Sequence, residues 1–86
     1  MKDVLVSISG CDLNYGLARD LARKIAERDE PDPMLIAWHD SRQNTHSPSC
    51  VKCEIGDRPG WEVYGENHGG RLRIIINDRQ YVFIYS

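Results

Sequence analysis

The chain has 86 residues, a length that holds one hydrophobic core and predicts a single domain over residues 1–86. Its apolar fraction of 41% and charged fraction of 28% are typical of a globular protein and argue against intrinsic disorder. The formal net charge of −2 gives no broad basic surface, so the composition does not favour nucleic acid as a partner.

The N-terminal segment, MKDVLVSISGCD, has no long apolar stretch after a basic one, as a secretory signal would. No run approaches the roughly 18 apolar residues of a membrane span. We therefore expect a cytoplasmic protein without membrane contact. The three cysteines form an odd set, which favours reduced thiols over a disulfide framework.

The N-terminal half predicts a strand, a helix and a second strand. Residues 2–9 alternate with a period of two, which is typical of a strand. Leu17, Leu21 and Ile25 form one apolar stripe on a helix that begins near Leu13 and ends near Asp29, before two prolines. Residues 34–39 have strand length and apolar character. This order predicts a right-handed crossover, with the two strands parallel and adjacent or one strand apart.

The C-terminal half predicts a meander of short strands. Residues 40–49 are polar and are expected to form a loop without regular structure. Strands are then predicted over residues 50–55, 61–66, 72–77 and 80–85, with turns at 56–60 and 67–70. The last two strands are expected to pair as a hairpin around Asn77 and Asp78, which tolerate a positive φ.

Together these elements predict an α+β fold of two layers, with one main helix against a mostly antiparallel sheet, in the order β-α-β-β-β-β-β. One helix of this length covers one face of such a sheet. The other face would expose the apolar strand residues whose side chains point away from the helix, which are Leu5, Leu35, Ile75, Val82 and Ile84. We therefore expect an interaction module, a homo-oligomer or a protein that docks a partner through this face or an edge strand, rather than an enzyme.

Three stretches carry a family resemblance: PDPMLIAWHD at 31–40, CEIGDRPGWEVYGENHGG at 53–70 and YVFIY at 81–85. They resemble a family of short prokaryotic proteins catalogued only as a domain of unknown function. The resemblance implies a stand-alone protein with no assigned activity, so it transfers no catalytic residue.

The competing hypothesis is a zinc site. His46, Cys50 and Cys53 follow the spacing H-x3-C-x2-C, and imidazole and thiolate are the ligands that Zn²⁺ prefers. His39, Asp40 and His68 are candidates for a fourth ligand. Against this, residues three apart on a regular strand point to opposite faces of the sheet, so Cys53 is equally explained as a small buried residue and Cys50 as incidental. A redox dithiol is less favoured, because no helix is predicted after the pair.

Two other groups of residues suggest further functional hypotheses. Cys11 lies between the first strand and the helix, where a helix N-terminus would favour a thiolate, and His39 or His68 would then have to serve as its base. Four arginines, with Tyr64 alongside, could stack bases or hold phosphate; these are Arg58, Arg71, Arg73 and Arg79. Cross-strand pairs with Glu62 and Glu66 are the commoner outcome. No glycine-rich phosphate loop is present.

Overall fold

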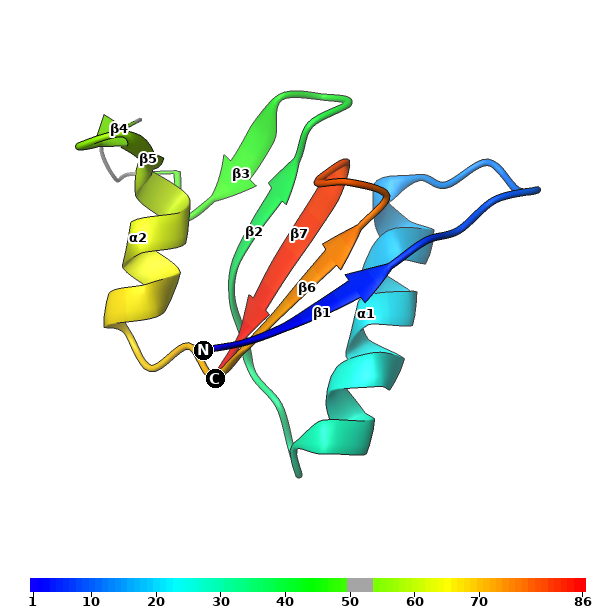
Figure 1. The fold of residues 1–86 in the computed structure, drawn as a ribbon, viewed down its shortest axis with the longest axis horizontal. Coiled ribbons are helices and arrows are strands. Elements are labelled where there is room, and N and C mark those ends of the chain that lie inside the picture. Colours follow the sequence, from blue (N-terminus) through cyan, green and yellow to red (C-terminus); the bar gives the residue numbers. More distant parts are fainter. Residues whose placement is uncertain (50–53) are drawn as a thin grey trace.

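The computed structural model describes residues 1–49 and 54–86 (Figure 1). Within them the chain is α+β, as the sequence predicts, and combines two helices, a five-stranded mixed sheet and a small hairpin. The elements in chain order are β1 (Lys2–Val6), α1 (Tyr15–Asp29), β2 (Leu35–Asp40), β3 (Thr45–Ser47), β4 (Glu54–Ile55), β5 (Arg58–Pro59), α2 (Gly60–Asn67), β6 (Leu72–Ile76) and β7 (Tyr81–Tyr85).

The five-stranded sheet has the order β1-β6-β7-β2-β3, and β4 and β5 form a separate two-stranded hairpin. β1 pairs with β6 in parallel, and every other pair in the sheet is antiparallel. β1 and β2 therefore run in the same direction, as expected. They are separated by two strands, however, so the prediction of adjacency or a single intervening strand was wrong. The β6–β7 hairpin takes the centre because its residues are apolar on both faces and nearly all buried.

Helix α1 covers one face of the sheet. It begins after Asn14, whose side chain accepts a hydrogen bond from the Leu17 N–H at 2.8 Å, and it ends at Asp29 as predicted. Three alanines, Ala18, Ala22 and Ala26, are fully buried against the sheet. Their small side chains bring the helix close to Phe83 and the other residues of this core, while Leu17 of the predicted stripe is 39% exposed.

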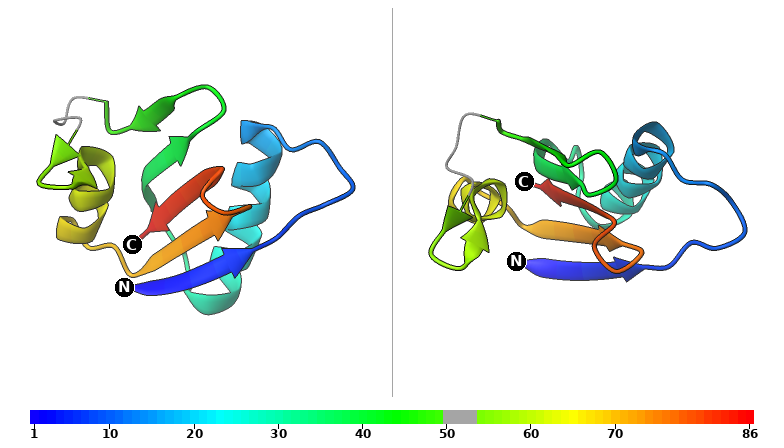
Figure 2. Two further views of the ribbon diagram at one scale, coloured as in Figure 1. Left: turned by 45° about the horizontal axis from the view of Figure 1, so that its top comes forward. Right: turned by 90° about the horizontal axis from the view of Figure 1, so that it is seen from above.

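Residues 61–66 do not form the predicted strand, because they lie in helix α2. The alternation of apolar and polar residues over this stretch is short and fits either structure. The deciding contact is tertiary, since α2 packs on the second face of the sheet opposite α1 (Figures 1 and 2). Gly65 permits this approach, because a Cβ built on it would lie only 2.8 Å from Ile84 Cδ1 and 3.3 Å from Ala37 Cβ. The protein thus has a helix on each face of its sheet instead of two layers.

Helix α2 covers the second face that the sequence predicts to be exposed. Ile75, Val82 and Ile84 are buried there with Ala37 and Trp61. Leu35 lies instead with the core under α1, because a bulge between Leu35 and Ala37 interrupts the alternation of side chains along β2. Of the five residues expected on this exposed face, only Leu5, on the edge strand β1, has an exposed side chain.

The turns and short strands agree in part with the predictions. The β6–β7 hairpin turns through Asn77, Asp78 and Arg79, all with positive φ, as expected of its sequence. The segment 40–49, predicted to be irregular, contains β3, which pairs with β2. The first strand ends at Val6 rather than residue 9. Of the strand predicted over 50–55, only Glu54–Ile55 lies within the described residues. In the described part of the chain, no helix is long and apolar enough to span a membrane.

The junction between α2 and β6 offers a test of this packing. The Gly70 N–H donates to the Gly65 carbonyl oxygen, and a Cβ on Gly70 would lie 2.5 Å from that oxygen and 2.9 Å from Ile84 Cγ2. Gly70→Ala must therefore displace backbone, and we expect it to lower the free energy of unfolding by about 1–3 kcal/mol. Urea denaturation followed by circular dichroism measures the loss.

Gly16→Ala is the matched control, because its new Cβ would make only an ordinary contact, at 3.5 Å from Asn14 Oδ1. We expect it to be neutral or slightly stabilising, since alanine favours a helix. If Gly70→Ala proved as stable as the control, the close approach of α2 to the sheet would be refuted.

Candidate functional site

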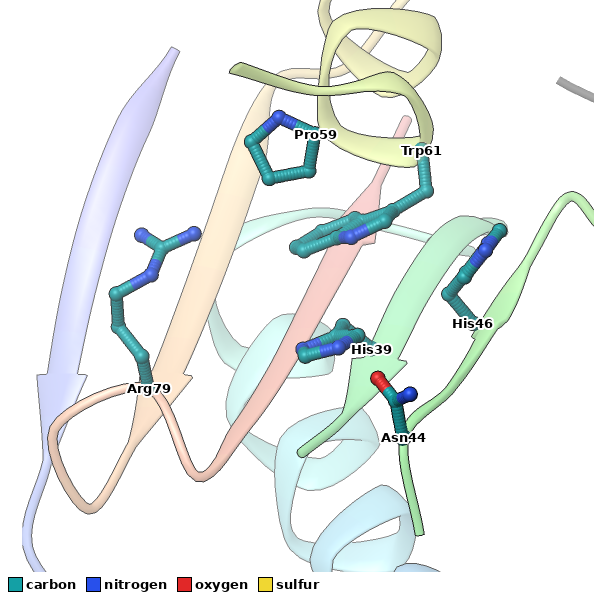
Figure 3. A pocket seen from close by; sticks show the side chains of 6 residues that line it. All are labelled: His39, Asn44, His46, Pro59, Trp61 and Arg79. Atoms are coloured by element: carbon teal, nitrogen blue, oxygen red, sulfur yellow. The ribbon is translucent and has the colours of Figure 1, made fainter. Parts of the chain in front are cut away.

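A cavity of about 400 Å³ opens where the N-terminal end of α2 meets the second face of the sheet (Figure 3). Strands β2 and β3 supply one wall, and the β6–β7 turn supplies the opposite side. Its lining residues are His39, Asn44, His46, Pro59, Trp61 and Arg79. Cavities of this size are typical of sites for small ligands.

The two histidines meet because their strands are paired. His39 on β2 lies directly opposite His46 on β3, and directly opposed side chains project from the same face of a sheet, with Cβ atoms about 5 Å apart. Asn44 precedes β3 with a φ of 54°, a left-handed conformation that asparagine tolerates in a tight turn. The β2–β3 hairpin thus supplies three of the six lining residues.

Trp61 forms the apolar part of the cavity. It lies in the first turn of α2 and is nearly fully buried. Its indole stacks on the His39 imidazole with a centroid distance of 5.2 Å and an interplanar angle of 7°. Burial lowers the pKa of His39 below its usual value, and the nearby His46 and Arg79 act in the same direction. Asp40 and Glu62 oppose this shift but do not cancel it.

A network of ion pairs lies beside the cavity. The buried Glu62 carboxylate accepts hydrogen bonds from Arg73 at 2.9 Å and from Arg79 at 3.0 Å, and Arg58 lies 3.7 Å away. Arg73 also donates to Asp3 at 2.8 Å, and this bond lowers the pKa of Asp3. Removing one partner from such a buried set is costly, because it leaves a charge unpaired. The network therefore helps to fix α2 on the sheet and Arg79 at the cavity.

The same network accounts for the arginines that the sequence singled out. Arg73 pairs with Glu62 and Glu66, as predicted, although the glutamates lie on a helix rather than a strand. Arg58 pairs with Glu66, and Arg71 lies 3.9 Å from Glu30. Tyr64 stacks on His68 instead of lying beside the arginines as a platform for bases. The four arginines thus each face a carboxylate of this chain.

Among the described residues, the structure separates the two histidines that were predicted as metal ligands. Cys50 and Cys53 lie outside the described residues. His46 lines the cavity near the start of α2, whereas His68 caps the other end of this eight-residue helix, about 12 Å along its axis. Asp40 is buried and accepts the N–H groups of Arg42 and Gln43. Within residues 1–49 and 54–86, no three His, Cys, Asp or Glu side chains converge on a point that could hold a metal ion.

Cys11, the candidate nucleophile, lies in the loop before α1 with an exposed side chain. Asn14 is the N-cap, so Cys11 lies three residues ahead of the N-cap and outside the turn where a helix N-terminus acts strongly on charge. The proposed bases pack elsewhere, His39 against Trp61 and His68 against Tyr64. The geometry thus gives Cys11 no partner for catalysis among the described residues.

Sequence reasoning identified both histidines of the cavity but missed three other lining residues. Asn44 and Pro59 were read only as loop or turn residues, and Trp61 as part of a strand. Arg79 was assigned to a turn and to an arginine cluster, without its position beside the histidines. The pairing of His39 with His46 needed the β2–β3 hairpin, for which the polar segment 40–49 gives no clear pattern.

With this geometry in place, comparison with known proteins identifies the class. The chain belongs to the family described as "Domain of unknown function (DUF5619)", whose model matches residues 1–85. A similar uncharacterised protein from Archaeoglobus fulgidus is 35% identical over 66 residues, which span 77% of this chain and 68% of the relative. The crystal structure of a novel protein from the same organism is also similar, with a TM-score of 0.81 and 28% identity. That match covers 100% of this chain and 93% of the other.

The environment of His39 predicts a pH dependence of stability. Because burial lowers its pKa in the folded state, the unfolded chain binds the proton more readily. The resulting stability is present above the unfolded pKa of about 6.5 and is lost as the pH falls through the folded value. We expect His39→Gln to reduce the loss of unfolding free energy as the pH falls, as measured by urea denaturation at several pH values. NMR titration of the wild type should place the His39 pKa below 6.5.

His68→Gln is the matched control, since its ring lies at the exposed end of α2 and not in the cavity. It should lose unfolding free energy at low pH as the wild type does. If both variants reduced this loss equally, the assignment to His39 would be contradicted.

Proposed function

We propose that this protein is an interaction module that forms a homodimer by pairing its edge strand β1 with β1 of a second copy. The observation that carries the proposal is the exposure of Leu5, whose side chain is 78% exposed on an edge strand. Edge strands with exposed apolar side chains readily pair with another chain unless they are covered or charged. No residue of the proposed interface needs catalytic chemistry.

The remaining geometry favours this edge over other surfaces. The sequence also predicted docking through the second face of the sheet. This face is not available for docking, because α2 covers Ile75, Val82 and Ile84. The opposite edge of the sheet, β3, has only three residues and is followed by Pro48, which cannot donate a backbone hydrogen bond. β1 is longer and carries no proline.

The hydrogen bonds between β1 and β6 show which backbone N–H and C=O groups of β1 remain available to pair with a second copy. The Lys2 N–H donates to the Arg71 carbonyl, and the Val6 carbonyl accepts from the Asn77 N–H, so these residues point their polar backbone groups inward, toward β6. Backbone groups alternate in direction along a strand. The N–H and C=O groups of Asp3 and Leu5 therefore point outward, and those of Ser7 do so as the alternation continues.

A two-fold register centred on Leu5 uses all of these groups. It places Leu5 opposite Leu5 of the second copy and Asp3 opposite Ser7, so that every pair of outward-facing residues exchanges backbone hydrogen bonds. The intervening pair is Val4 with Val6, whose side chains extend the apolar face under α1. No like charges oppose each other. A two-fold axis through this edge is the simplest closed assembly, and it would join two five-stranded sheets into one.

The dimer is tested by sedimentation of the wild type at tens of micromolar, where we expect two copies per particle. Leu5→Lys places a cation opposite its own copy across the axis and removes the central apolar contact. It should weaken association by about tenfold or more, equivalent to ~1.4 kcal/mol. The folding stability of the monomer should change little, because the side chain is exposed.

Met34→Lys is the control, since Met34 is also exposed, at 65%, but does not lie on β1. It should leave the assembly intact. Amide hydrogen exchange provides a second readout, because protection of the Asp3, Leu5 and Ser7 amides should rise with protein concentration while that of Val4 should not. A wild type that stays monomeric throughout this range would refute the proposal.

A metal- or thiol-dependent function using His46, Cys50 and Cys53 is a second proposal, which one observation of the described residues favours. His46 Nδ1 lies 3.1 Å from the Pro48 carbonyl oxygen. A carbonyl accepts but cannot donate, so Nδ1 carries the proton and a neutral ring presents the lone pair of Nε2. Histidines that bind zinc commonly have this arrangement.

This second proposal predicts that about one Zn²⁺ per chain co-purifies with protein made without a histidine tag. Cys53→Ser should then lower both the metal content and the thermal midpoint, because metal binding contributes to folding free energy. Cys11→Ser is the control, since Cys11 lies in the loop before α1. Metal-free wild-type protein of unchanged stability would rule the site out.

A further inference from the structure

We infer that the cavity between β2, β3, α2 and the β6–β7 turn binds a small oxyanion, either a carboxylate or a phosphate ester. β1 contributes none of the residues that line this site, although Arg79 also borders a second hollow that Leu5 and Ser7 line. The inference stands on the donors that line the cavity, on the charge balance of Arg79 and on the uncapped helix that begins beside it.

The lining contains a guanidinium and an amide as hydrogen-bond donors and contains no carboxylate. Arg79 and the Asn44 side-chain amide supply its donors, and Trp61 and Pro59 supply apolar surface. The two histidines are polar, but a neutral imidazole donates only from the ring nitrogen that carries the proton, and His46 Nδ1 already lies 3.1 Å from the Pro48 carbonyl oxygen. The chain as a whole has 13 acidic and 11 basic residues, so a cavity without an acidic side chain does not simply reflect composition. Such a donor set suits a ligand that only accepts hydrogen bonds, which is the character of an oxyanion.

The positive charge of Arg79 is only partly balanced by the carboxylates of this chain. Among the described residues, its hydrogen bonds all run from Nη2 to the two oxygens of Glu62, at 3.0 and 3.1 Å. Glu62 is shared with Arg73 and Arg58, whereas these two arginines have further carboxylates in Asp3 and Glu66. A guanidinium has five N–H donors, so Arg79 retains capacity for a second, bidentate partner. Figure 3 shows its side chain across the cavity from His46.

The start of α2 adds a second source of positive potential. Its N-cap is Pro59, which makes no side-chain hydrogen bond to the first turn. Pro59 and Trp61 both line the cavity, so α2 begins beside it. Unsatisfied N–H groups and the helix dipole favour an anion at this position. Here the helix terminus acts together with Arg79 and Asn44 and is not the only donor.

The test uses sulfate, inorganic phosphate and malonate as probes, at constant ionic strength set with chloride, on zinc-free wild-type protein at neutral pH. We expect saturable NMR shifts of the Trp61 indole N–H and the Asn44 side-chain amide. Arg79→Gln should weaken binding by about tenfold or more, since a charged bidentate contact is lost. Stronger binding of malonate would identify a carboxylate site, and stronger binding of phosphate would identify a phosphate site.

Arg71→Gln is the matched control, because it removes the same charge at an exposed position whose partner is Glu30. It should bind the probes as the wild type does. Asn44→Gly provides a second variant, since glycine accepts the positive φ at this position and only the amide is lost; it should weaken binding several-fold without unfolding the chain. The inference is overturned if no probe saturates up to on the order of 10 mM, or if Arg79→Gln and Arg71→Gln weaken binding equally.

Discussion

The packing of α2 on the second face of the sheet is the constraint on which most of this structure depends. It requires residues without side chains at Gly65 and Gly70, because any Cβ there would meet Ile84 or the helix backbone. Once α2 is in place, the residues of β6 and β7 that point away from α1 become core instead of surface. The short chain thereby buries both faces of its central hairpin without a partner subunit, which is how a domain of this size can form a sufficient core.

The same contact creates the candidate site. Trp61 is buried in the first turn of α2 and stacks on His39, while the next residue, Glu62, holds Arg79. The helix therefore brings together side chains from β2, from the β3 strand and from the β6–β7 turn. Among the described residues, the cavity beside α2, which has no acidic lining residue, and the outer edge of β1 are the two features on which the proposals depend. Asn44 lines the cavity and lies outside β1, and Leu5 lies on β1 and does not line the cavity, so mutation of these two residues can separate ligand binding from self-association.

Much of the fold follows from local patterns in the sequence. The period of 3.6 over residues 15–29, together with the cap at Asn14, specifies α1, and the apolar runs at the C-terminus specify the β6–β7 hairpin. Residues 61–66 were misassigned because a six-residue stretch of mixed apolar and polar side chains fits a strand as well as a helix. Leu35 was expected on the wrong face of the sheet for a similar reason, since the β-bulge that moves its side chain to the other face depends on pairing with β7.

The amino-acid sequence by itself determined the α+β class, the extent of α1, the terminal hairpin and the pairing of Arg73 with glutamates, because each depends on residues close together in the chain or on charge complementarity. Only the tertiary structure decided which faces of the sheet are covered, that His39 and His46 share a cavity with Arg79, and that Leu5 lies on an open edge. These features depend on strand order and on a helix packing against strands far away in sequence. Local periodicity carries no information about such long-range contacts, because it reports which side of an element is apolar and not what covers it.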